Sequence, residues 1–127
     1  MLDKSSILFE RNDKGELIPQ EIEVVIDESD PEQLKFKGEK IVVTPISRGE
    51  LKELFAPVEE GTEKDLDGII ISKHCVNPSF TLEDTQYIKP PFTNVLVNTI
   101  FVASGLERRN NNSKKSVQEA EDEFAKN

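Results

Sequence analysis

Tryptophan is absent from this sequence, and histidine, cysteine, tyrosine and methionine each occur once. The single cysteine, Cys75, excludes a disulfide within the chain, which makes a reducing cytoplasm its natural setting. The single histidine, His74, excludes a metal site built from two histidines of one chain. Without tryptophan, the volume of the core has to come from phenylalanine, leucine, isoleucine and valine.

Long apolar runs are also lacking. No stretch approaches the ~20 apolar residues that cross a bilayer, so we predict no contact with the membrane interior. Residues 1–16 have no apolar segment long enough for a secretory signal, and we expect none. The length of 127 residues fits one domain.

Basic clusters are few. The net charge is −9, and neighbouring basic residues occur only at Arg108–Arg109 and Lys114–Lys115. Nucleic-acid phosphates would repel such a chain, so we predict no nucleic-acid partner. The acidity either attracts basic proteins or only keeps the chain in solution, and composition leaves both interpretations open.

Motifs of catalysis are missing as well. His74 and Cys75 are adjacent, and neighbours on a helix point about 100° apart, so they do not form a nucleophilic pair. We expect His74 on a helix face and Cys75 packed as a small apolar residue. The six glycines form no phosphate-binding loop, and residues 27–30 lack the glycine and glutamate of a calcium loop. The sequence therefore predicts no enzyme, no cofactor and no metal site.

The first part of the chain, about residues 6–45, has the period of two that is typical of strands. The expected strands are residues 6–10, 22–26, 34–37 and 40–44. Residues 12–15 supply turn chemistry, and a hairpin is expected to turn near Gly38. These patterns predict a small antiparallel sheet with one face in water.

The second part, about residues 47–105, has helical spacing and repeated start signals. Helices are expected to begin near Ser47 with Glu50, Thr62 with Asp65, Thr81 with Asp84, and Pro91. The second helix is expected to run to about Cys75, although residues 69–71 also suit a strand. The last helix, ending at Gly105, is apolar nearly all round, which is typical of a central core helix or a binding surface.

Together these patterns predict an α+β domain over residues 1–106: a sheet followed by a bundle of three to four helices. Residues 107–127 are polar and predict a mostly disordered tail. Within it, Ser116 and Glu119 form a capping-box pattern, and Val117, Ala120 and Phe124 have helical spacing. The segment 116–125 is thus either a short helix that folds on a partner or a frayed, solvated end. The residues predicted to bind a partner are Phe92, Leu96, Val117 and Phe124.

Three stretches carry a resemblance to a known family. They are Leu34–Ser47, with Glu50 and Leu51 opening a helix, Ile71–Phe80, and the helix from Pro91 through Leu106. In spacing and hydrophobic pattern, residues 6–106 resemble the small tail assembly chaperones of long-tailed bacteriophages.

This resemblance implies a protein of the host bacterial cytoplasm that binds the tape measure protein and keeps it soluble while the tail tube assembles. It also implies absence from the mature virion, with the major tail (tube) protein as a further partner and weak self-association. Two other functions stay open: a minor tail or connector protein retained in the virion, and an enzyme or acidic inhibitor that mimics nucleic acid.

Overall fold

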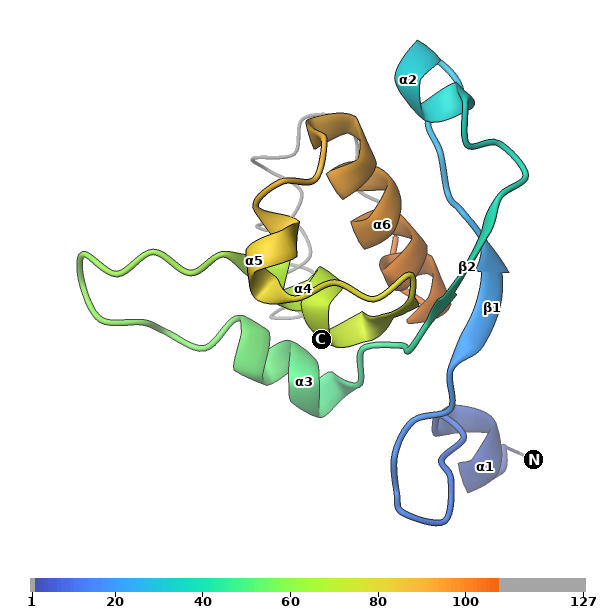
Figure 1. Ribbon diagram of the computed structural model, residues 1–127. Coiled ribbons are helices and arrows are strands. Elements are labelled where there is room, and N and C mark those ends of the chain that lie inside the picture. Colours follow the sequence, from blue (N-terminus) through green and yellow to red (C-terminus); the bar gives the residue numbers. More distant parts are fainter. Residues whose placement is uncertain (1, 108–127) are drawn as a thin grey trace.

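The computed structural model describes residues 2–107, and Figure 1 shows their arrangement. The elements, in chain order, are α1 (Lys4–Ile7), β1 (Gln20–Glu23), α2 (Pro31–Leu34), β2 (Lys40–Val43), α3 (Arg48–Leu54), α4 (Leu66–His74), β3 (Cys75–Asn77), α5 (Leu82–Thr85) and α6 (Pro90–Ala103). The predicted α+β class is confirmed. The predicted tail helix, with Val117 and Phe124, lies outside the described residues.

The sheet is antiparallel throughout, with the strand order β1-β2-β3. Ile22 of β1 lies opposite Ile41 of β2, and Val43 of β2 lies opposite Cys75 of β3. The third strand therefore comes from the part of the chain expected to form the helical bundle, although not from residues 69–71, which also suited a strand. The helix expected to continue to Cys75 ends at His74, because Cys75 adopts an extended conformation and pairs with β2.

Two predicted strands are wrong. Residues 6–10 do not form one: α1 ends at Ile7, and the chain that follows makes only an isolated bridge, between Arg11 and Leu17. Residues 34–37 are not a strand either, because local helix signals prevail there. Pro31 occupies the first turn of α2, and the Asp30 carboxylate accepts the Glu32 N–H at 2.9 Å.

The predicted helix starts are confirmed in part. Ser47 caps α3 by accepting the Glu50 N–H at 3.3 Å, but the Glu50 carboxylate turns to another partner and leaves the capping box half complete. Asp65, and not Thr62, caps α4 through the Gly68 N–H. At α5 both bonds of the Thr81–Asp84 capping box form, each at 3.0 Å.

Helix α6 is the centre of the molecule, as its apolar pattern predicts. Every residue from Val95 to Phe101 is buried. The helix packs against α4, the sheet and α2, which surround it in Figure 1. It closes with a Schellman motif, in which Gly105 has φ +81° and Leu106 N–H bonds Phe101 O at 2.8 Å.

A fully buried hydroxyl joins α6 to the chain that follows β1. Thr99 Oγ1 accepts the Val25 N–H at 2.9 Å and donates to Val95 O at 2.7 Å. Val25 lies two residues beyond the end of β1, so its amide would otherwise lack a ladder partner. Thr99 therefore anchors the β1 side of the sheet to the central helix.

The change Thr99→Val keeps the shape of the side chain and leaves the Val25 N–H without an acceptor. We expect the free energy of unfolding to fall by about 1–3 kcal/mol. Denaturant unfolding measures the loss, with Thr93→Val in the first turns of the same helix as the control. If both changes lowered the free energy of unfolding equally, the hydrogen bond of the Thr99 hydroxyl to Val25 would not account for the loss.

Two helical glycines should respond oppositely to alanine. A Cβ at Gly68 would collide with the Asp65 carboxylate and lie 2.9 Å from Thr85 Oγ1, whereas at Gly49 the nearest atom is 4.0 Å away. Gly68→Ala should therefore destabilise the protein by about 1–2 kcal/mol through overpacking. Gly49→Ala should stabilise it by up to about 1 kcal/mol through helix propensity. Thermal unfolding of the two variants checks the opposite signs.

Candidate partner-binding surfaces

Metal binding and nucleophilic attack both depend on side chains such as His, Cys, Asp and Glu. Within residues 2–107, no three His, Cys, Asp or Glu side chains are grouped so that they could hold a metal ion. Cys75 is buried, as predicted, and burial raises the pKa of its thiol to about 11. The thiol therefore stays protonated at neutral pH, which makes it a packing group and a poor nucleophile.

The ionisable groups that do meet are His74 and Glu50. His74 is only 3% exposed, and its Nε2 lies 3.1 Å from Glu50 Oε2, while its Nδ1 lies 3.1 Å from Thr44 Oγ1. Burial lowers the pKa of His74, and this outweighs the attraction of Glu50. The ring is therefore neutral at pH 7: Nε2–H donates to Glu50, and Nδ1 accepts the Thr44 hydroxyl proton.

This network joins the end of β2 to α3 and α4. The Thr44 N–H also bonds His74 O at 2.8 Å, so His74 is held through both its ring and its backbone. The three side chains resemble a hydrolase triad in kind, but the imidazole ring itself is buried in the core. His74 lies on a helix face as predicted; its partner Glu50 was missed, because a pairing over 24 positions leaves no periodic signal.

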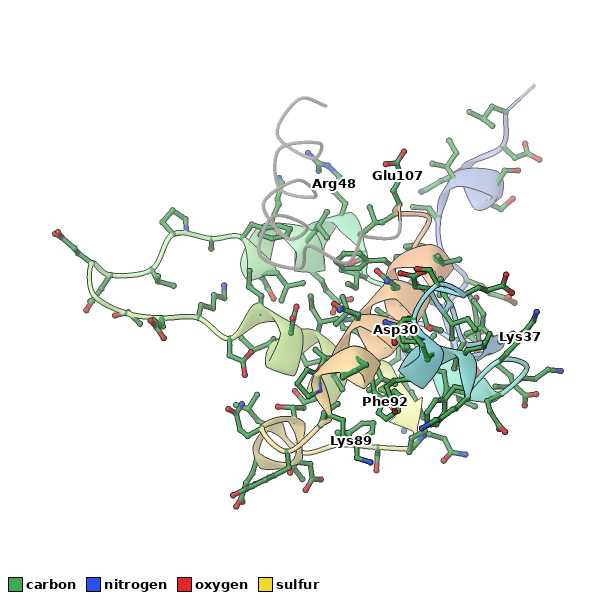
Figure 2. All side chains as sticks on the ribbon, turned by 90° about the horizontal axis from the view of Figure 1, so that it is seen from above. Asp30, Lys37, Arg48, Lys89, Phe92 and Glu107 are labelled. Carbon is green, nitrogen blue, oxygen red and sulfur yellow. The ribbon has the colours of Figure 1, made fainter. Side chains whose placement is uncertain are left out.

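Apolar side chains outside the core form a first surface at the start of α6. The Phe36 and Phe92 rings meet edge to face, with centroids 4.3 Å apart and planes at 69°. Leu34 is 43% exposed and Phe36 is 36% exposed. We call Leu34, Phe36 and Phe92 the aromatic patch. Figure 2 shows Phe92 beside α2, which carries Leu34.

Two of the residues predicted to bind a partner, Phe92 and Leu96, differ in their exposure. Phe92 is partly exposed at the aromatic patch, whereas Leu96, one turn further along α6, is buried in the core. Leu96 is therefore outside the surface that a partner can reach in this conformation. Leu34 and Phe36 were missed because their alternation with lysines was interpreted as a strand with one wet face.

Charged residues that form ion pairs are neighbours of Leu34 and Phe36 in the chain. Lys37 lies 2.9 Å from Glu28, and Lys35 lies 3.1 Å from Glu32. The hydrogen bond that the Lys37 ammonium donates to Glu28 raises the pKa of Lys37. Such exposed pairs add little stability, but they leave the patch as apolar surface inside a polar rim, which is the anatomy of many protein interfaces.

A second surface lies between the N-terminal residues and the start of α3. It is a groove of about 700 Å³, which we call the N-terminal groove, lined by Ile7, Leu8, Phe9, Arg11, Gly15, Glu16, Leu17, Ser47, Arg48, Gly49 and Glu50. Ile7 is 66% exposed and Leu8 is 47% exposed, and the core cluster includes neither. The groove thus has an apolar wall on one side and the polar first turn of α3 on the other.

Comparison of the chain with protein-family models, with curated proteins and with solved structures found no match. None of the helices within residues 2–107 combines the length and the apolar character needed to cross a membrane.

The His74 network predicts a dependence of stability on pH. Because the pKa of His74 is lower in the folded chain than its ordinary value of 6.5, the unfolded chain takes up the proton first as the pH falls. The stability that the neutral ring contributes is therefore present above pH 6.5 and is lost on acidification below it. We expect His74→Gln, which keeps a donor for Glu50, to show a smaller loss between pH 7.5 and 5 in denaturant unfolding at about 25 °C. Identical slopes would contradict the assignment, since the acidic groups are common to both proteins.

Proposed function

We propose that this protein is a tail assembly chaperone of a long-tailed bacteriophage. In the cytoplasm of the host bacterium it binds the tape measure protein, keeps it soluble while the tail tube assembles, and is absent from the mature virion. The major tail (tube) protein is proposed as a further partner, with weak self-association. The protein acts by binding and not by catalysis.

The observation that carries the proposal is the aromatic patch. Leu34, Phe36 and Phe92 present apolar surface on a domain whose core is complete without Leu34 and Phe36. Exposed apolar clusters with a polar rim are typical of protein-binding sites, and aromatic residues are enriched among the anchors of interfaces. The resemblance of residues 6–106 to the chaperone family supplies the identity of the client.

The charge of the chain supports the same function. At a net charge of −9, copies of the domain repel one another, and a client covered by them acquires that repulsion. A modest patch also suits reversible release, since several weak contacts along a long client can dissociate one at a time.

The double variant Leu34→Ser/Phe36→Ser tests the patch. In the chaperone family that the chain resembles, the tape measure protein is encoded immediately downstream. Co-expressed with that gene product, the double variant should recover on the order of tenfold less of it in a pull-down, because anchor residues dominate binding energy. The downstream protein should also lose solubility.

A matched control is available in α5 and the turn that follows it. Leu82→Ser/Tyr87→Ser removes two apolar side chains that are even more exposed, at 51% and 82%, from a different part of the chain. It should leave the recovery unchanged, and thermal unfolding of both variants checks that each is folded. Equal recovery with the two variants would remove the aromatic patch from the proposal.

The alternative is a minor tail or connector protein that stays in the particle. Binding through an apolar patch suits this function as well. Mass spectrometry of purified virions separates the two, because the chaperone should be missing and the structural protein should be present in a fixed ratio.

A further inference from the structure

The chain leaves α6 next to the N-terminal groove. The Ile46 N–H donates to Ser104 Oγ at 2.7 Å, which fixes the end of α6 beside Ile46. The next residue, Ser47, lines the groove. Glu107 follows Ser104 by three residues, and Figure 2 shows it between α1 and α3 on the same side as Arg48. The last described residue, Glu107, therefore lies beside the groove.

The basic residues of the groove are unlike those elsewhere on the described chain. Arg11 and Arg48 are the two arginines among residues 2–107, and both line the groove. A guanidinium binds a carboxylate through two parallel hydrogen bonds, which a lysine does not do. The lining also holds two carboxylates, but Glu16 accepts a hydrogen bond from Asn12 and Glu50 accepts one from His74. The two arginines are therefore the groups of this groove that suit an acidic segment with an apolar face.

Such a segment follows Glu107 in the sequence. Residues 116–125 contain Glu119, Glu121, Asp122 and Glu123 but no basic residue. At helical spacing, Val117, Ala120 and Phe124 share one face, and Glu121 borders it. A ten-residue helix is about 15 Å long, and the eight residues between Glu107 and Ser116 reach up to about 28 Å. The segment is therefore long enough to lie in the groove of its own chain.

We propose that residues 116–125 dock as an amphipathic helix in the N-terminal groove of the same chain. Val117 and Phe124 contact the wall formed by Ile7, Leu8 and Phe9, and the carboxylates pair with Arg11 and Arg48. The short connection keeps the segment at a high effective concentration, so a weak contact is enough. The docked helix covers the apolar N-terminal residues that the core does not use. This inference is independent of the client and of the proposed function.

Paramagnetic relaxation in the full-length protein tests the docking. Gln118→Cys places a nitroxide on the polar face, while the native Cys75 stays unlabelled because it is buried with a pKa of about 11. The amide signals of residues 7–17 and 47–50 should broaden, those around the exposed Gly61 should not, and a tenfold dilution should change nothing. Broadening elsewhere, no broadening, or broadening that disappears on dilution, as for a second copy, would overturn the proposal.

Two pairs of variants in the labelled protein test the chemistry. Arg11→Glu/Arg48→Glu should reduce the relaxation at the groove about fivefold or more, because charge-assisted pairs become repulsive. Lys35→Glu/Lys37→Glu makes the same change in charge beside α2 and should leave it unchanged. Phe124→Ser should reduce it and Asn127→Ser should not. If the arginine and lysine variants reduced the relaxation equally, the charge pairs would be wrongly assigned. If Phe124→Ser and Asn127→Ser reduced it equally, the contact of Phe124 would be wrongly assigned.

Discussion

The burial of α6 on all sides is the constraint on which the rest of the structure depends. Seven consecutive residues, Val95–Phe101, are removed from water, so every face of the helix needs a covering element. Helix α4 covers one side, the sheet another, and α2 lies against its first turns. The sheet has three short strands, so its packing against α6 contributes much of its stability. The Thr99 hydroxyl accepts the hydrogen bond from Val25 that a further strand would otherwise accept.

The surfaces proposed for function lie near the two ends of this helix. At its first turn, Phe92 meets Phe36 and extends the apolar surface outward from the core. At its last turn, Ser104 holds the start of α3 and directs the chain toward the N-terminal groove. We propose the first surface as the binding site for a client and the second as the docking site for the chain's own C-terminal segment. A helix that is fully buried in the middle places both where they do not compete for the same residues.

The sequence predicts best where a signal is local. The apolar pattern of α6, the Thr81–Asp84 capping box and the Ser47 cap are each encoded within a few residues, and each is confirmed. Near Leu34 two local signals conflict, and the Asp30–Pro31 helix start prevails over the alternation of Leu34 and Phe36 with lysines. That error hid the aromatic patch, of which only Phe92 was predicted. The β2–β3 pairing and the contact between His74 and Glu50 join distant residues, so no periodicity reveals them.

Native-state hydrogen exchange tests the central role of α6 most directly. If the fold is built around this helix, the amides of Val95–Phe101 exchange only through global unfolding, with the same free energy that denaturant unfolding gives. The amides of α1 exchange through local opening at much lower free energy, since none of its residues is buried. The account would be contradicted if α6 opened on its own, at a free energy well below that of global unfolding, while β1 and β2 stayed protected.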